Sequence, residues 1–588
     1  MNKILLILAG TALTLTLRAQ PPGPPNPPGP PVPTQHNEAT IAQLQAEMAS
    51  GKLTSEKLTG EYIARINALD QNGPGVNSVI ELNPDALNMA KNADKLRKQG
   101  KLLGPLHGIP VLLKDNIDTG DKMQTSAGSF ALVGQPAQQD STVAANLRAG
   151  GAVILGKTNL SEWANFRSFE SISGWSGRGG QTNNPYGINR NPCGSSAGSG
   201  AATSANFTAV SLGSETDGSI VCPGNANGVA AIKPTVGLVS RAGVVPISHT
   251  QDTIGPHGRT VADAAAVLGV IQSRTFDGRD PATDGVPLGW QGTGKTRPTN
   301  IPTDYTQFVN ANGLSGARLG LTRAGLTGFT NVSTPQSVLD AFEAAVNELT
   351  AAGATVIDLD DAGFTFPSAD GEFFILLYDF KFDVAKYFTT RVGVPVAGGT
   401  LQTAIDFNNA HADEEMPFFN QDIFELAETI NPDPDFVDPN FGLSYNQALA
   451  IDHNAGVNGI DAAISQFNLD AVVTATDNPA WSTDLIYGDH FIFGTSGLAA
   501  APGYPIVQVP AGIVHGMPLG ISFFGTAFSE PALIKLASGF EAATQVRAHN
   551  LPTFPIFAPA NNIQGTTVAP SHGHSSNKDN AKKKPHHL

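Results

Sequence analysis

The chain of 588 residues is poor in cysteine and in basic side chains. With only 2 cysteines, its fold cannot depend on a framework of several disulfides. Its 35 Lys and Arg residues are outnumbered by 51 Asp and Glu, and the formal charge is −16. Phosphate binding needs clustered basic residues, so we expect no nucleic-acid partner. The H-E-x-x-H zinc motif is absent, and no other histidine pattern predicts a metal site.

An apolar run lies near the N-terminus, where it extends from Ile4 to Leu17 after Lys3. It is shorter than the roughly 20 residues that a membrane-spanning helix needs, but it suits the apolar core of a signal peptide. We therefore predict a signal peptide over residues 1–19, ending at Ala19, and a secreted or periplasmic protein without a stable membrane anchor. An uncleaved anchor is the alternative interpretation.

Composition divides the rest of the chain into three parts. The proline-rich residues 20–36 predict an extended linker. The polar residues 558–588, which end in KKKPHHL, predict a disordered tail. Between them, residues 37–557 are long enough for several domains or for one large sheet-based domain, and a hydrophobic content of 41% supplies its core.

Helix and strand patterns alternate along residues 37–557, which is typical of the α/β class. The short apolar run from Leu106 to Ile117 predicts a strand that delivers Lys114 near its end. Helical, acidic material over 371–428 predicts a cap or an elaboration on the substrate side. The other expected elements are helices that begin near Thr40 and Asn83, a helix between them through residues 58–69, helices over 141–149 and 334–351, and strands over 152–155, 355–359, 469–473 and 505–509.

Gly, Ser and Ala are most concentrated between Asn191 and Pro234. Two hydroxyl clusters lie there, at 194–196 and at 217–219. A flexible linker can share this composition, but a linker does not contain an alternating apolar segment such as residues 207–212. We predict a small-residue helix after the first cluster, then a strand, a tight turn and a helix that begins near Ser219. Glycines in such turns leave unhindered N–H donors for a ligand.

The two cysteines, Cys193 and Cys222, each lie within three residues of a serine in these clusters. In an exported protein they can form a disulfide, but two small buried thiols explain them equally well. Both interpretations stay open at this point.

Two short motif matches are rejected on their context. Residues 289–296 satisfy the phosphate-loop pattern, but prolines on both sides exclude the strand and the helix that this loop requires. Residues 194–198 match the G-x-S-x-G nucleophile elbow with Ser196 at the centre, but loop-forming residues 183–187 precede them instead of a strand.

Longer motifs resemble the amidase signature family, and within it the bacterial peptide amidases. They are G-I-P-V-L-L-K-D-N at 108–116, C-G-S-S at 193–196, E-T-D-G-S-I at 215–220, G-L-V-S-R at 237–241 and D-T-I-G-P at 252–256, and N-L-S-E-W-A-N at 159–165 is similar to the peptide-amidase branch. The resemblance spans residues 37–557. It implies one α/β/α sandwich, with a large mixed β-sheet flanked by helices, and an enzyme that hydrolyses carboxamides without a cofactor.

The resemblance also implies a Ser–cis-Ser–Lys triad. Ser219 corresponds to the nucleophile, Ser195 to the relay serine that follows a cis peptide bond, and Lys114 to the base. The backbone N–H groups of Thr216, Asp217, Gly218 and Ser219 correspond to the oxyanion hole.

Lys114 can act as a base only if burial keeps its amine neutral. The apolar residues 111–113 before it favour burial, whereas a surface lysine paired with Asp115 is the alternative. Two positions depart from the commoner family pattern. Ala197 and Asp217 stand where many members have glycine, and Asp217 is shared with the peptide-amidase branch.

We expect peptide C-terminal amides, or other small amides, as substrates. One alternative is an amidotransferase subunit that supplies ammonia to a charged tRNA, and another is a non-catalytic binding protein of the same fold. The sequence carries no signal for an oligomeric state.

Overall fold

The computed structural model describes residue 32 and residues 34–284, 296–327 and 333–557. The predicted signal peptide (1–19) and tail (558–588) lie outside the described residues. So do most of the predicted linker (20–36) and most of the rejected phosphate-loop match at 289–296.

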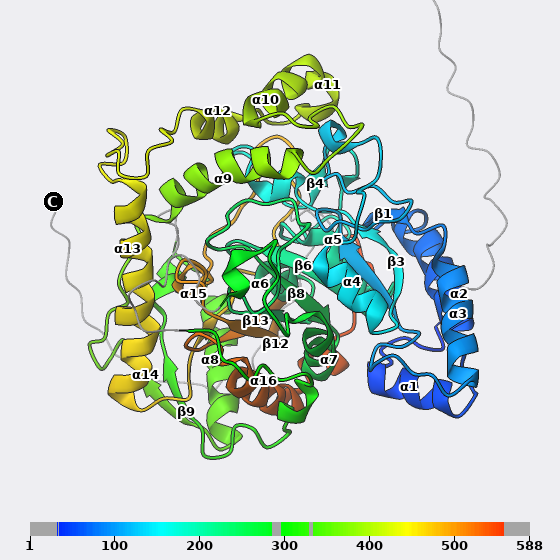
Figure 1. Cartoon of the computed structure of the whole chain (residues 1–588). Helices are drawn as coiled ribbons and strands as arrows, with labels where there is room; N and C mark the ends of the chain where they lie inside the picture. The colour runs from blue at the N-terminus through cyan, green and yellow to red at the C-terminus, as the bar shows by residue number, and fades with distance from the viewer. Residues whose placement is uncertain (1–31, 33, 285–295, 328–332, 558–588) are drawn as a thin grey trace, which may run out of the picture.

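A mixed β-sheet runs through the centre of the fold (Figure 1). In the described part of the chain it has 11 strands, in the order β1-β3-β2-β6-β8-β7-β12-β13-β11-β9-β10. Strand β2 lies parallel to both β3 and β6, and β8 lies antiparallel to β6. The bounds are β1 Val79–Leu82, β2 Pro110–Lys114, β3 Val153–Thr158, β6 Val210–Glu215, β7 Ala230–Lys233, β8 Thr253–Gly258, β9 Arg318–Leu321, β10 Thr355–Asp358, β11 Ala471–Ala475, β12 Ile506–Val514 and β13 Met517–Phe524, while β4 Trp175–Ser176 and β5 Gly180–Gln181 form a separate pair.

Helices surround the sheet on both faces. Their bounds are α1 Ile41–Ala49, α2 Ser55–Arg65, α3 Ala86–Lys98, α4 Thr142–Ala149, α5 Ala197–Ser204, α6 Val221–Ala226, α7 Val261–Ile271, α8 Gln336–Ala351, α9 Glu372–Phe388, α10 Leu401–Ala410, α11 Ala412–Glu415, α12 Asp422–Glu428, α13 Tyr445–Gly456, α14 Ala462–Phe467, α15 Gly497–Ala500, α16 Glu530–Thr544 and α17 Val546–His549.

The side chains of β6 show how the layers are arranged. Ser211 faces α5, because its hydroxyl donates to the backbone oxygen of Ser199 at 2.8 Å. Val210 and Leu212 point the other way, into the hydrophobic core that also holds α7. Helices α4, α7, α16 and α8 contact one another in series, and α5 contacts α6. The predicted α/β/α sandwich around a large mixed sheet is confirmed.

Close packing of α5 explains why the sequence concentrates small residues here. A Cβ atom at Gly198 would lie 2.3 Å from the carbonyl oxygen of Ser78 and 2.5 Å from that of Asn159. A Cβ atom at Gly213 on β6 would lie 2.6 Å from the hydroxyl oxygen of Ser196. Only glycine fits such distances, so helix and sheet approach each other almost backbone to backbone.

The predicted elements agree with the structure to within a few residues, with one difference. Thr40 caps α1, as expected, in a capping box with Gln43. The second helix was expected to run through residue 69, but α2 ends at Arg65 and the chain continues as a π-helical turn over Ile66–Asp70. The reason lies in Asp70, whose carboxylate accepts the backbone N–H of Ser78 at 2.6 Å and fixes the turn into β1.

The predicted cap over 371–428 consists of α9, α10, α11 and α12, which lie across the upper edge of the molecule in Figure 1. Helices α9, α10 and α12 share a second hydrophobic cluster, which is separate from the core of the sheet. Trp163 belongs to this cluster and makes edge contacts with Phe388 and Phe424 at ring-centroid distances of 6.1 and 5.6 Å. The cap is therefore packed against the loop that follows β3.

Candidate active site

Lys114 is the last residue of β2 and is completely buried. Its Nζ donates to the Ser195 hydroxyl oxygen at 2.7 Å, to the Ser214 hydroxyl oxygen at 2.9 Å and to the Ser214 carbonyl oxygen at 3.1 Å. The alternative of a surface lysine paired with Asp115 is wrong, because the Asp115 carboxylate pairs with Arg178 at 3.1 Å.

Burial lowers the pKa of Lys114 to about 7, although the carboxylates of Asp252 and Glu215 oppose this effect. At neutral pH a large fraction of the amine is therefore uncharged. An uncharged amine carries a lone pair and can accept a proton from the hydroxyl to which it is hydrogen-bonded.

Ser195 follows the cis peptide bond Gly194–Ser195 and is fully buried. Its carbonyl oxygen accepts the backbone N–H of Ser161 at 3.0 Å. Ser196 next to it has a different environment, since its hydroxyl donates to the Ser214 carbonyl oxygen at 3.0 Å. As expected, the residues directly before Gly194 form no strand, so the nucleophile-elbow interpretation of Ser196 lacks its structural context.

Ser219 lies in the turn between β6 and α6 and lines a large cavity. Its carbonyl oxygen accepts the backbone N–H of Ser196 at 3.1 Å, which joins the two serine segments. Gly218 before it has a φ of 76°, a left-handed conformation that favours glycine. Within the described residues, no group accepts a hydrogen bond from the backbone N–H groups of Asp217, Gly218 and Ser219. These donors are thus available to a ligand in the cavity.

The turn is braced by residues to which sequence reasoning gave no role. The Glu215 carboxylate accepts the backbone N–H groups of Ile220 and Val221 at 2.7 and 3.0 Å, at the start of α6. The Thr216 hydroxyl donates to the Asp252 carboxylate at 2.6 Å. Glu215 and Asp252 both lie in the motifs that carried the family resemblance. Their place in these motifs is the sequence signal that could have identified them.

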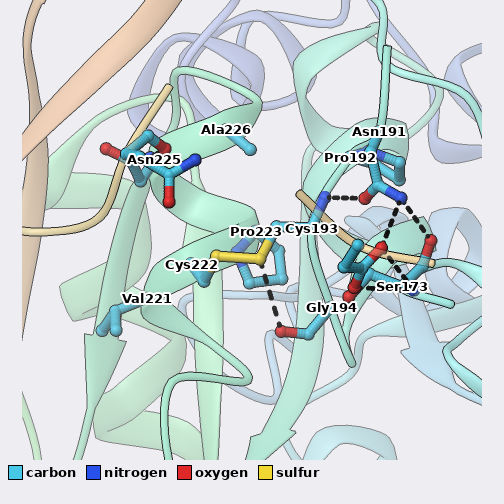
Figure 2. Close-up of a disulfide and its surroundings, with 12 residues drawn as sticks. Ser173, Asn191, Pro192, Cys193, Gly194, Val221, Cys222, Pro223, Asn225 and Ala226 are labelled. Carbon is cyan, nitrogen blue, oxygen red and sulfur yellow. Dashed lines mark hydrogen bonds between the residues drawn. A yellow bond between two sulfur atoms is a disulfide. The ribbon is translucent and has the colours of Figure 1, made fainter. Parts of the chain in front are cut away.

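A disulfide joins the two serine segments (Figure 2). Cys193 and Cys222 are bonded, with Cα atoms 5.9 Å apart, so the alternative of two free thiols is excluded. The backbone N–H of Cys193 donates to the Asn191 side-chain oxygen at 2.8 Å, and the Asn191 amide donates to the Ser173 carbonyl oxygen at 2.9 Å. Figure 2 shows this chain of contacts beside the disulfide.

The cavity has a volume of about 810 Å³. Its lining includes Gly194, the turn over 216–219, the disulfide and residues of α9. A cavity of this size holds a peptide-sized fragment rather than only a small amide.

Among the described residues, one group of possible metal ligands has suitable spacing, His249 with Asp379 and Asp383. Burial alone would lower the pKa of His249, but the two carboxylates outweigh it and raise the pKa to about 9. His249 therefore carries a proton at neutral pH and forms an ion pair with Asp383 at 2.9 Å. A metal ion would have to displace this proton before the imidazole could ligate it.

A buried lysine of depressed pKa is hydrogen-bonded to one serine, and that serine segment is joined through the backbone to a second serine at a cavity. These residue types are compatible with a hydrolase whose serine is activated by lysine. The protein-family model described as Amidase matches residues 57–433, and the chain belongs to this family. It is an amide hydrolase, as the resemblance implied.

Individual proteins that are similar to this chain are described as amidases or as an amidotransferase subunit. The chain is 41% identical over 523 residues to a protein of Arabidopsis thaliana described as "Probable amidase", covering 87% of this chain and 91% of the relative. The solved structure of native peptide amidase from Stenotrophomonas maltophilia is 44% identical, with a TM-score of 0.77 over 89% of this chain and 100% of that chain. A glutamyl-tRNA(Gln) amidotransferase subunit of Salinispora arenicola is 30% identical over 526 residues, or 87% of this chain and 98% of the relative.

Proposed function

We propose that this protein is an exported amidase that hydrolyses the C-terminal amide of peptides through an acyl-enzyme, with Ser219, Ser195 and Lys114 as its catalytic residues. The observation that carries the proposal is the 2.7 Å hydrogen bond from Lys114 Nζ to Ser195 Oγ in a fully buried setting. Neutral lysine is a competent base only in such a place.

In the first half-reaction the Ser219 oxygen attacks the amide carbon. Its proton passes to the Ser195 oxygen, and the Ser195 proton passes to Lys114 Nζ. The negative charge on the former carbonyl oxygen is held by backbone N–H groups of the turn over 216–219. When the C–N bond breaks, the proton returns from Lys114 through Ser195 to the departing nitrogen, and ammonia leaves.

In the second half-reaction water attacks the ester formed on Ser219. Ser195 and Lys114 accept the proton of the water by the same route. Collapse of the intermediate breaks the ester bond, returns the proton to the Ser219 oxygen and releases the carboxylic acid. No other group is needed to balance the protons.

The choice of peptide amides is supported by the 44% identity to the Stenotrophomonas maltophilia peptide amidase and by the large cavity. Export is supported by the N-terminal apolar run and by the disulfide, a bond that persists in oxidising compartments. Within the described residues no helix is both long enough and apolar enough to cross a membrane.

A second candidate function is the supply of ammonia within a tRNA-dependent amidotransferase complex. The 30% identity to the glutamyl-tRNA(Gln) amidotransferase subunit of Salinispora arenicola favours it. The formal charge of −16 opposes it, because a complex that holds tRNA needs basic surface.

Release of ammonia from a peptide amide, an aryl amide and a fatty amide tests the proposal, with the chain free of other subunits. We expect the peptide amide to be the best substrate and the Ser219→Ala variant to lose at least about 10³-fold in kcat. Ser196→Ala is the matched variant at the other candidate hydroxyl and should keep most of the activity. If Ser219→Ala stays active while Ser196→Ala does not, the assigned nucleophile is wrong. Ammonia release that requires added partner proteins would support the amidotransferase alternative.

A further inference from the structure

The active-site cavity is lined by acidic side chains. Among the described residues that line it there is no Lys, Arg or His. The acidic residues are Glu170, Asp217, Glu372, Asp477 and Asp489. An enclosed space with one sign of charge favours substrates of the opposite sign.

Most of these carboxylates have partners of their own or stand at the mouth. Asp489 accepts the backbone N–H of Ser173 at 3.0 Å and the indole N–H of Trp481 at 3.3 Å. Glu372 accepts the side-chain amide of Gln251 at 2.8 Å. Glu170 is exposed to solvent at the rim.

Asp477 differs from all of them. Its side chain is only 1% exposed, yet neither carboxylate oxygen has a hydrogen-bond partner among the described residues. Burial of a carboxyl group without a hydrogen-bond partner costs free energy of folding. The presence of Asp477 here therefore points to a hydrogen-bond partner that comes from outside the chain. The cavity is the space beside it from which that partner can come.

The charged groups that act on the pKa of Asp477 are carboxylates. Burial, and then the carboxylates of Glu215 and Asp217, raise the pKa of Asp477 well above its usual range. The buried Lys233 acts on the pKa values of Glu215 and Asp217, and its Nζ donates to the carbonyl oxygen of Tyr504 at 2.6 Å. No described ion pair includes Asp477.

The wall next to Asp477 is aromatic. A Cβ atom at Gly494 would lie 2.5 Å from Asp477 Oδ1 and 2.7 Å from the ring of Phe491, so both groups border the space that this glycine leaves free. Phe491 makes an edge contact with Trp481 at a centroid distance of 5.8 Å. A carboxylate beside aromatic rings is a favourable environment for an organic cation, which gains from both.

We propose that Asp477 and Asp217, with the aromatic wall beside them, form a subsite for a positively charged group of the substrate, an alkylammonium or a guanidinium carried by the acyl side. Asp217 is exposed to the cavity next to the nucleophile, and Asp477 supplies the unpartnered carboxylate. The preferred substrates are thus peptide amides whose terminal residue is basic, and acidic ones are excluded. This inference rests on the proposed function for its substrate class.

A binding measurement tests the subsite without any hydrolysis. Calorimetry compares n-pentylammonium with 1-pentanol, its neutral counterpart, on the full chain, on Asp477→Asn and on Asp413→Asn. Asp413 is exposed on α11, away from the cavity lining, so this variant makes the same Asp-to-Asn change outside the cavity. We expect Asp477→Asn to weaken n-pentylammonium binding about tenfold or more and Asp413→Asn to leave it unchanged, since a charge-assisted hydrogen bond is lost only in the first.

A kinetic measurement tests the specificity. The substrates are acetyl-lysinamide, acetyl-norleucinamide and the amide of acetyl-glutamic acid, which differ in side-chain charge. We expect kcat/KM to fall in this order in the unmodified chain, and the lysine-to-norleucine ratio to drop about tenfold in Asp477→Asn. A merely structural carboxyl would lower all three rates together and leave the ratio unchanged, so an unchanged ratio overturns the proposal.

The proposed amidase function and the proposed cation subsite can be refuted separately. If amides are hydrolysed without charge preference and n-pentylammonium does not bind, the subsite is refuted and the amidase function stands. If n-pentylammonium binds in an Asp477-dependent way and no peptide amide is hydrolysed, the subsite stands and the proposed substrate class is wrong. The substrate series on the unmodified chain decides the matter even if Asp477→Asn does not fold.

Discussion

Replacement of Lys114 by methionine should make the protein more stable at neutral pH while it destroys the activity. Lys114 is completely buried, and burial lowers its pKa from 10.5 to about 7. In the unfolded chain the ordinary value applies. Between pH 7 and pH 10.5 the unfolded lysine is therefore protonated and the folded one is largely not.

The sign follows from this difference. The unfolded state binds more protons in this pH window, so the folded state gains stability as the pH rises from 7 to 10.5, and the full penalty is present below pH 7. At about 1.36 kcal/mol per pH unit, the penalty amounts to about 5 kcal/mol. Methionine is apolar, of similar length, and does not incur it.

Methionine also removes three hydrogen bonds, but two of their acceptors keep other donors. The Ser214 hydroxyl still accepts from Asn116 at 2.9 Å, and its carbonyl oxygen still accepts from Ser196 at 3.0 Å. Only the Ser195 hydroxyl is left without its donor, which costs about 1–3 kcal/mol. The variant should be about 2–4 kcal/mol more stable at pH 7 and about 1–3 kcal/mol less stable at pH 10.5.

Urea denaturation at pH 7, 8, 9 and 10, followed by tryptophan fluorescence, measures this crossover. Groups that titrate alike in both proteins cancel in the difference between variant and unmodified chain. Lys101→Met, at an exposed position, is the matched control for the loss of one ammonium group. A difference in unfolding free energy that stays constant with pH would show that Lys114 is not the buried, mostly neutral amine described here.

Two further predictions follow from the same site. Asp252→Asn should move the acid limb of the pH profile of kcat/KM below pH 7. The reason is that the Asp252 carboxylate raises the pKa of Lys114 and is itself ionised above about pH 6. An acid limb that stays in place in a kinetic titration would contradict this effect of Asp252 on Lys114. Gly198→Ala should lower the unfolding free energy by about 1–3 kcal/mol, because the added Cβ atom meets two backbone carbonyl oxygens. Gly60→Ala is the control on α2, where the added Cβ atom meets open space, and it should raise the unfolding free energy by up to about 1 kcal/mol. Equal effects of the two variants in thermal denaturation would refute the packing argument.

Much of the local structure was predictable because its signals are local. The apolar residues 111–113 predicted a strand that ends at Lys114, and the alternation over 207–212 predicted the strand that became β6. The capping signal at Thr40 placed the first helix correctly. Residue spacing carries such information, since a strand or a cap involves only neighbours in the sequence.

The remaining parts of the site depend on contacts between distant segments. Asp252 reaches Thr216 because β8 lies antiparallel to β6, a register that no short motif encodes. Asp477 lines the same cavity and follows another strand, β11, more than 250 residues beyond Ser219. The pairing of the cysteines depended on a Cα separation that only the fold supplies.

The disulfide between Cys193 and Cys222 closes residues 193–222 into a covalent ring. This ring contains Ser195, α5, β6 and the turn with Ser219, so both serine hydroxyls of the proposed triad and the available N–H donors belong to one macrocycle. Lys114 is the one member of the triad outside it. In the proposed mechanism the catalytic centre is therefore a contact between two parts, a closed ring that carries both serines and a single strand that carries Lys114, and a backbone cut at one point of the ring would leave both serines tethered together.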